Sequence, residues 1–316
     1  MNTHKLIIII LFYISVSSVN YLRSNYFYVG KSAEYSILKK EKPNYLIIHL
    51  ITSLPLIMLM IFKFNTKFIL RISGLPRMNF LRKILWKIAF KKIYLVTCPT
   101  LETYNYIKQL NIVSESRLKI LYDPIIVVHK INKKKNEKIN IDFEYFLAIG
   151  RLTRQKNFLF LCKSFGKILS KHLNSTLLIA GEGEEFNKTN DYIKKNNLQQ
   201  NIQLIGYKEN IFPYLVKSKG FILSSLWEDP GFVLIEAAYC RTPVFSSDAK
   251  TGPKELIQDN FNGTNFKNNS ENDFIKNFDK FLENSKNKKI ILENLKLSKK
   301  FSLFQHFKNL QNYLTN

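Results

Sequence analysis

Short apolar runs typical of buried strands alternate with helix-like segments along most of the chain, and this alternation constrains the fold more than any other feature. The predicted strands are Tyr45–Leu50, Lys67–Ile72, Ile93–Thr97, Leu118–Leu121, Tyr145–Ile149, Ser175–Ala180, Ile202–Ile205, Gly220–Leu223 and Pro243–Ser246. The predicted helices are Lys31–Lys42, Leu54–Phe62, Phe80–Phe90, Thr100–Leu110, Asn157–Leu169, Phe186–Asn197, Asn210–Val216, Phe232–Cys240 and Lys254–Ile257, followed by a mostly helical tail over Asp273–Tyr313. Parallel strands need long crossover connections, usually helices, so the alternation predicts an α/β fold with parallel sheets.

One polar and highly charged segment, Ile131–Asn140, interrupts the alternation and is predicted to be a linker or an exposed loop. A chain of 316 residues suits two domains of ordinary size. We therefore expect two doubly wound Rossmann-like units, residues 1–125 and 143–296, joined by a linker over 126–142.

The chain is strongly basic, with 48 Lys+Arg against 24 Asp+Glu and a formal net charge of +24. The excess is densest in residues 1–125, which carry 18 Lys or Arg and 5 Asp or Glu. A basic, apolar surface suits anionic lipid as well as nucleic acid, and a coding bias toward Lys, Asn and Ile explains the charge equally well. No nucleic-acid recognition motif is visible, so nucleic acid is not expected as a partner.

Three widely separated cysteines, Cys98, Cys162 and Cys240, form neither a disulfide framework nor a CxxC metal-binding spacing. Their number and spacing predict a reducing compartment, and hence a cytoplasmic location.

Two apolar segments are long enough to raise the question of membrane insertion. Leu6–Val19 is similar to the hydrophobic part of a signal peptide, but it equally suits a buried parallel strand, which we favour. Tyr45–Phe62 is almost long enough to span a bilayer, and we interpret it as a strand followed by a helix that begins near Ser53.

Charged residues follow the predicted strand Tyr145–Ile149, at the edge where parallel α/β sheets bind ligands. Gly150 and Arg151 come directly after it, and Lys156 precedes the next helix. Two cations beside a helix N-terminus suit a diphosphate, although an exposed basic loop is the plainer interpretation. Gly181 and Gly183 follow the next strand and indicate a tight turn, which by itself is a weak signal for a ligand.

The most informative segment is residues 224–237, SSLWEDPGFVLIEA, which follows the predicted strand Gly220–Leu223. Glu228 lies in a turn and Glu236 lies inside the following helix, with the free amides of Gly231, Phe232 and Val233 between them. A carboxylate in the apolar run FVLIEAA needs hydrogen-bond donors, and a ribose offers two adjacent hydroxyls. The alternative is a capping carboxylate followed by an exposed helical glutamate.

These segments resemble the retaining glycosyltransferases of family 4. Glu228 and Glu236 match the E-x7-E pattern of that family, and AIGRLTRQKNF, LIAGEGEE, IQLIGY, SSLWEDPGFVLIEAAYCRTPVFSSD and GPKELI occur in the family's order over residues 145–260. The resemblance implies a GT-B fold, in which two Rossmann-like domains face a cleft. It also implies that residues 297–316 form a C-terminal helix packing back towards the N-terminal domain.

The resemblance also implies roles for single residues. Arg151 and Lys156 would hold the donor diphosphate, Glu228 would face the donor sugar, and Glu236 would bind the ribose. The remaining donor-binding positions that it implies are Gly150, Gly183, Gly206, Tyr207, Gly231, Phe232 and Val233. His49, at the end of the strand Tyr45–Leu50, would face the sugar, with an isolated structural histidine as the alternative. No metal or other cofactor is expected.

The N-terminal half resembles the acceptor domains of polysaccharide and lipopolysaccharide members more loosely, through ILRISGLP, LRKILWK, VTCPTLETY and LYDPI. Phe80–Lys92 is then a basic amphipathic helix suited to an anionic membrane surface, with a core helix as the equal alternative. The Gly-rich loop that usually opens the family does not follow Leu6–Tyr13, where Ser15, Ser17 and Ser18 stand instead. The N-terminal domain is therefore expected to be incomplete.

The expected function is transfer of a sugar from a nucleotide diphosphate-sugar, with UDP the commonest carrier in the family, to a glycan or lipid-linked acceptor in cell-surface polysaccharide synthesis. The expected location is the cytoplasm, peripheral to the inner face of the plasma membrane. The alternatives are a pseudoenzyme that binds nucleotide sugars without transferring them, a basic nucleic-acid-binding protein and, less favoured, a nucleotide-sugar epimerase.

Overall fold

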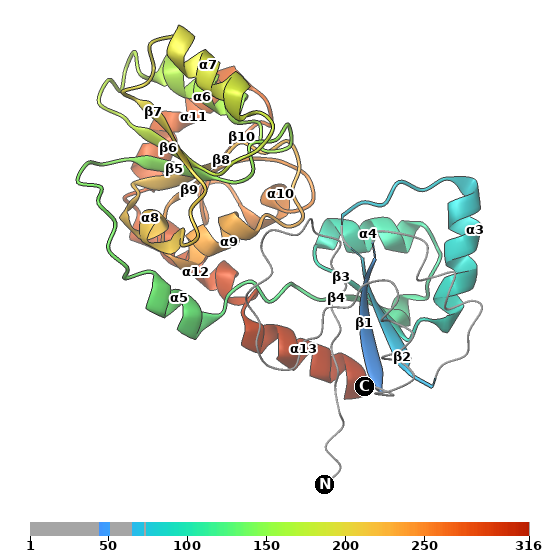
Figure 1. Ribbon diagram of the computed structural model, residues 1–316. Coiled ribbons are helices and arrows are strands. Elements are labelled where there is room, and N and C mark those ends of the chain that lie inside the picture. Colours follow the sequence, from blue (N-terminus) through green and yellow to red (C-terminus); the bar gives the residue numbers. More distant parts are fainter. Residues whose placement is uncertain (1–43, 51–64, 73, 316) are drawn as a thin grey trace. The chain divides into compact units, whose positions relative to one another are not determined.

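The computed structural model describes residues 44–50, 65–72 and 74–315 (Figure 1). The chain divides into two compact units, residues 1–121 and 122–316. The predictions for Leu6–Val19, Lys31–Lys42 and Leu54–Phe62 fall outside the described residues.

The described strands of unit 1 form a parallel sheet. They are β1 (Tyr45–Leu50), β2 (Lys67–Ile72), β3 (Leu95–Cys98) and β4 (Leu118–Ile120), and they lie in the order β1-β2-β3-β4. Every pairing between neighbours is parallel, as the alternation predicted. The strands are apolar on both faces because helices cover a parallel sheet from both sides.

Two helices of unit 1 begin at side-chain caps. Asn79 Oδ1 accepts a hydrogen bond from Arg82 N at 2.8 Å before α3 (Phe80–Ala89), and Thr100 Oγ1 accepts one from Thr103 N at 3.2 Å before α4 (Leu101–Gln109). A short 3₁₀ turn, Phe90–Lys92, follows α3. These caps satisfy amide groups that have no partner inside the helix.

Unit 2 contains a six-stranded parallel sheet. Its strands are β5 (Phe146–Ile149), β6 (Leu177–Ala180), β7 (Ile202–Gly206), β8 (Gly220–Leu223), β9 (Val244–Ser247) and β10 (Thr264–Phe266). They lie in the order β10-β9-β8-β5-β6-β7. Numbered from β5, this is the strand order 3-2-1-4-5-6 of a Rossmann sheet, which confirms the predicted doubly wound topology.

Helices cover both faces of this sheet (Figure 1). The helices of unit 2 are α5 (Val128–Lys134), α6 (Phe158–Ile168), α7 (Phe186–Lys195), α8 (Phe212–Lys217), α9 (Phe232–Tyr239), α10 (Pro253–Leu256), α11 (Glu271–Asn284), α12 (Lys288–Lys299) and α13 (Leu303–Thr315). One core lies under α6, α7 and α11 and is rich in phenylalanine, while a second lies under α8, α9 and α10. Two buried layers of this kind hold the strand ends, and the loops that follow them, in fixed positions.

The structure differs from the sequence-based expectation at two short elements. Residues 128–134 were expected in a linker but form α5, because Ile131 is buried in the core of unit 2 and anchors the helix. β10, which pairs in parallel with β9, has only three residues and no apolar run that marks it in the sequence.

Candidate nucleotide-sugar site

The strand order of unit 2 reverses between β5 and β8. β5 neighbours both β6 and β8, so the chain winds outward from it in both directions. The helices that follow β5 and β8 therefore lie on opposite faces of the sheet, and ligands of parallel α/β sheets bind at the carboxyl edge where such a reversal occurs. Arg151 and Lys156 lie on the first loop, and Glu228 lies on the second.

Hydrogen bonds join these two loops along their length. Leu226 N donates to Gln155 O at 2.8 Å, and Gln155 Nε2 donates to Trp227 O at 2.8 Å. Ser224 Oγ donates to Lys156 O at 2.8 Å. These hydrogen bonds hold the two loops against each other at the switch point of the sheet.

An ion pair completes this contact. Lys156 Nζ lies 2.5 Å from Glu228 Oε1, and both side chains are largely buried, with 16% and 6% of their surfaces exposed. Ser225 Oγ donates a second hydrogen bond to the same oxygen at 2.5 Å. Thr251 Oγ1 donates to the backbone carbonyl of Glu228 and fixes the turn from behind. The structure thus brings together two residues that are 72 positions apart and that sequence reasoning had placed at one site.

Glycines after β5 and β6 allow close contacts within the loop that follows β5 and between the loops that follow the two strands. A Cβ on Gly150 would lie 3.0–3.2 Å from the aliphatic stem of Lys156, so the absent side chain leaves room for that stem. A Cβ on Gly181 would lie 1.9 Å from Gly150 O, and one on Gly183 would lie 2.4 Å from Leu152 O. Gly183, predicted from the motif as a ligand contact, is required by this backbone packing.

Arg151 follows Gly150 with an exposed side chain that forms no hydrogen bond or ion pair with any residue the structure describes. An uncommitted guanidinium at the carboxyl edge of the central strand is available to an anionic ligand.

The N-terminus of α9 presents backbone donors beside Glu228. Gly231 caps the helix with φ 96°, a conformation that favours glycine, and a Cβ on it would lie 3.4 Å from the Glu228 side chain. The backbone N–H groups of Gly231, Phe232 and Val233 donate no hydrogen bond within the described part of the chain. Together with the positive end of the helix dipole, they form a site suited to a phosphate or a sugar hydroxyl.

Glu236 lies one turn further along α9. Burial raises the pKa of its carboxyl to about 7. No described residue donates a hydrogen bond to this carboxyl. A desolvated carboxylate without donors is unfavourable, and a ligand with hydroxyl groups would stabilise its ionised form.

The remaining predicted positions are Gly206 and Tyr207 in unit 2 and His49 in unit 1. Gly206 ends β7, two strands from β5, with φ 68°, and a Cβ on it would meet no atom within 4 Å. Tyr207, which follows it, is exposed. His49 lies within β1 of unit 1, where its Cα pairs with that of Arg71, and its side chain is outside the described part of the structure. The proximity of these residues to a donor stays a prediction.

Sequence reasoning missed four residues that position the predicted ones. Gln155, Ser224, Ser225 and Thr251 hold the two loops and the Glu228 carboxylate in place. The pair Ser224-Ser225 directly after a buried strand was the available signal, because hydroxyl side chains at the carboxyl end of such a strand need partners.

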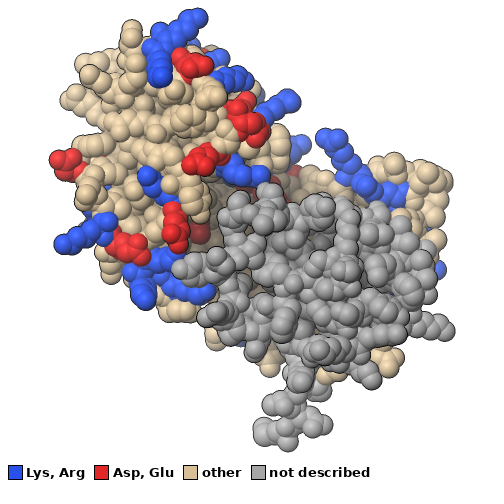
Figure 2. Space-filling view, viewed as in Figure 1, with Lys and Arg blue, Asp and Glu red and all other residues tan. Residues whose placement is uncertain are grey.

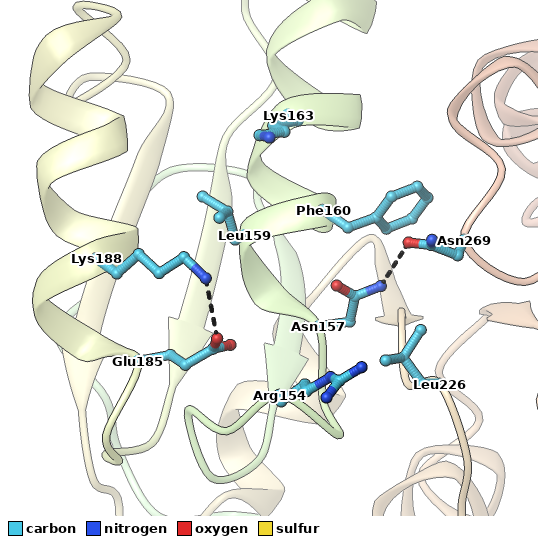
Figure 3. Close-up of a pocket in the computed structure, with 9 residues that line it drawn as sticks. All are labelled: Arg154, Asn157, Leu159, Phe160, Lys163, Glu185, Lys188, Leu226 and Asn269. Atoms are coloured by element: carbon cyan, nitrogen blue, oxygen red, sulfur yellow. Dashed lines mark hydrogen bonds and ion pairs between the residues drawn. The ribbon is translucent and has the colours of Figure 1, made fainter.

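A separate hollow of about 390 Å³ lies between α6, the start of α7 and the loop after β10 (Figure 3). Its lining residues are Arg154, Asn157, Leu159, Phe160, Lys163, Glu185, Lys188, Leu226 and Asn269, and none of them is a predicted donor residue. Two polar contacts already engage its walls, Lys188 Nζ with Glu185 Oε1 at 3.2 Å and Asn157 Nδ2 with Asn269 Oδ1 at 3.0 Å. We therefore place the candidate site at the switch point and not in this hollow.

Comparison with known proteins identifies the family. Residues 129–297, more than half of the chain, match the family model of the group 1 glycosyl transferases. The chain belongs to this family.

Similar proteins include an uncharacterized glycosyltransferase of Methanocaldococcus jannaschii, which is 34% identical over 242 residues, or 70% of this chain and 59% of the relative. An N-acetylgalactosaminyltransferase of Campylobacter jejuni that acts on a diphospho-undecaprenol-linked sugar is 29% identical over 177 residues, covering 56% of this chain and 47% of the relative. The chain thus spans about half to three fifths of the length of these relatives.

Two solved structures share the fold. TarM superposes with a TM-score of 0.72 at 21% identity, covering 90% of this chain and 57% of that one. The structure of Anabaena HepE in complex with UDP gives a TM-score of 0.72 at 15% identity, covering 92% and 85%. The fold is GT-B, as the sequence resemblance implied.

Proposed function

We propose that this protein transfers a sugar, with retention of anomeric configuration, from a UDP-sugar to a glycan or lipid-linked acceptor in cell-surface polysaccharide synthesis. The observation that supports it most is the buried Lys156–Glu228 pair, held between two loops at the switch point of a Rossmann sheet. The Campylobacter relative, named for an undecaprenol-linked substrate, supports the acceptor class.

The donor diphosphate is proposed to lie against Arg151, Lys156 and the free amides at the start of α9. As the bond between the sugar and the diphosphate breaks, negative charge grows on the leaving phosphate. Fixed cations and helix amides stabilise that charge without having to reorganise, and this is how such sites accelerate group transfer. Glu228 is proposed to face the donor sugar, close enough to share the Lys156 ammonium with the diphosphate.

The ribose is proposed to bind Glu236, donating its two hydroxyls to the carboxylate. Each charge-assisted hydrogen bond contributes about 1.5–3 kcal/mol. The base is proposed to lie near Gly206 and Tyr207, and His49 near the sugar. Because Arg151, Lys156 and amides supply the positive charge, we expect transfer to proceed in EDTA.

Calorimetric titration with UDP tests the donor site. We expect Lys156→Ala and Glu236→Ala each to weaken UDP binding at least about tenfold, the loss of one charge-assisted contact. Lys163→Ala is the matched control, because Lys163 lines the separate hollow of Figure 3, and it should bind as the wild type does.

Unchanged binding in both site variants, or equal losses in the Lys163 control, would overturn the proposal. Transfer itself is measured with a panel of UDP-sugars and undecaprenol-linked glycans. Binding without transfer or donor hydrolysis across that panel would favour the pseudoenzyme.

A further inference from the structure

The outward side of α3 in unit 1 carries large apolar side chains. Phe80 and Leu81 are 78% and 76% exposed, and Ile84 and Ile88 are also exposed. The opposite side of the helix holds Trp86 and Ala89 in the core of unit 1. The helical period places Leu81, Ile84, Leu85 and Ile88 on one face. Leu85 packs against the core, whereas the other three side chains are turned to solvent.

A row of lysines runs along the same outward side. Lys83 and Lys87 lie one helical turn apart, and Lys91 follows a turn later in the 3₁₀ segment. None of the three side chains forms an ion pair or hydrogen bond with a described residue. Like charges at this spacing destabilise a helix by about 0.2–0.5 kcal/mol per pair. The row therefore weakens the isolated helix and needs a negative partner to become favourable.

No acidic residue of the surrounding sequence supplies that partner. Residues 42–101 contain ten Lys or Arg and no Asp or Glu. Figure 2, by contrast, shows Lys and Arg interleaved with Asp and Glu over the visible face of unit 2. The excess charge of this chain is concentrated where apolar side chains are exposed.

We propose that the outer face of α3, formed by Phe80, Leu81, Ile84 and Ile88 with Lys83, Lys87 and Lys91, docks on an anionic lipid bilayer. The apolar side chains enter the boundary between headgroups and acyl chains, while the lysines contact anionic headgroups. The helix lies in the plane of the interface, and no helix in the described part of the chain is long and apolar enough to cross a membrane.

Other occupants fit this face less well. A second copy of α3 would bring two rows of unpaired lysines together. A nucleic acid would use the lysines but leave three aliphatic side chains without a contact. A bilayer surface satisfies the apolar and the basic residues at the same time.

Flotation of the full chain with lipid vesicles, without donor or acceptor, tests the proposal independently of transfer activity. We expect binding to vesicles of equal parts phosphatidylglycerol and phosphatidylcholine, and little binding to phosphatidylcholine alone. Replacing Lys83, Lys87 and Lys91 with Gln should reduce partitioning about 100-fold, or roughly fivefold per lysine. Phe80→Gln with Leu81→Gln should reduce it about tenfold or more.

Matched controls lie in unit 2. Lys286, Lys288 and Lys289 are exposed, and changing them to Gln removes the same net charge. Phe304 and Leu173, 76% and 74% exposed, match Phe80 and Leu81 in type and exposure, and are likewise changed to Gln. Both control variants should float as the wild type does, and circular dichroism checks that every variant is folded.

Three results would each overturn the proposal. They are a wild type that does not float with anionic vesicles, α3 variants that float undiminished, and control lysines whose loss matters as much as that of the α3 row. A lipid-free dimer that the Phe80→Gln and Leu81→Gln changes dissociate, without flotation, would assign the face to a second copy instead.

Discussion

The two parallel sheets of this chain differ in the order of their strands, and the difference locates the chemistry. The described strands of unit 1 follow one another in chain order from β1 to β4. In unit 2 the order reverses between β5 and β8, and a buried lysine–glutamate pair lies where the loops of those two strands meet. A reversal leaves a crevice that a steady progression does not. Unit 1 instead offers an outward helix face with exposed apolar and basic residues.

The largest effect expected in unit 2 tests whether the buried ion pair differs from an exposed one. Lys156→Met should lower the free energy of unfolding by about 3 kcal/mol, because it leaves the Glu228 carboxylate buried and unpaired. Adding Glu228→Gln should restore much of this loss. Urea unfolding of the two single variants and the double variant gives the coupling energy.

Lys219 and Glu144 form the matched exposed pair, with Nζ and Oε2 2.8 Å apart. Removing either partner should cost less than about 1 kcal/mol, since exposed pairs are screened by water. Equal coupling in the two pairs would contradict the structural distinction between the switch point and the surface.

The next effect concerns Glu236, and its sign follows from the raised pKa. Below the ordinary value of 4.5 the carboxyl is protonated in both the folded and the unfolded chain. Between 4.5 and about 7 only the unfolded chain ionises, so stability falls as pH rises, and the full cost remains above 7. Glu236→Gln should therefore be more stable than wild type by about 3 kcal/mol at pH 8, and by little at pH 4.

The affinity for UDP should also depend on whether the Glu236 carboxyl is ionised. If ribose hydroxyls bind the ionised carboxylate, wild-type affinity rises as pH increases from 5 to about 7, and Glu236→Gln shows no such rise. Calorimetric titration across this pH range measures the UDP affinity of the wild type and of Glu236→Gln. A parallel pH dependence in the two proteins would assign the effect to another group.

A smaller effect separates two glycines that the family pattern treats alike. Gly183→Ala drives a Cβ against the Leu152 backbone, whereas Gly206→Ala meets open space and only the strain of a positive φ. We expect Gly183→Ala to cost about 1 kcal/mol more stability than Gly206→Ala. Thermal unfolding compares the stability of the two variants. A larger loss of stability in Gly206→Ala would contradict the packing role of Gly183.

The smallest effect belongs to unit 1. Phe80→Gln with Leu81→Gln should change the free energy of unfolding by less than about 0.5 kcal/mol, since both side chains are mostly in solvent. Trp86→Ala, on the buried side of the same helix, should cost about 3–5 kcal/mol. Denaturant unfolding compares them, and a large loss in the double variant would show that its residues serve the core.

Local sequence patterns predicted the elements of this fold well. Continuous apolar runs identified β1 and β2 with their boundaries, because strands buried on both faces have little freedom in composition. β10 was missed because three residues carry no pattern, and α5 because a single buried residue, Ile131, anchors a charged helix.

The site was predictable only in part. Lys156 and Glu228 were placed at one site by strand-end position and family resemblance, but their direct contact depends on strand order, which local sequence does not encode. The orientation of α3 was likewise undetermined, because its helix period is compatible with either side facing the core. Trp86 and Phe90 bury more surface than Leu81 and Ile84 and direct the helix inward.

A crystal structure of the chain with a bound UDP-sugar tests the central claim most directly. The account predicts the diphosphate within hydrogen-bonding distance of Lys156 Nζ and of the amides of Gly231 to Val233, with the ribose on the Glu236 carboxylate. A donor found instead in the hollow between α6 and α7, with the Lys156–Glu228 pair untouched, would contradict it.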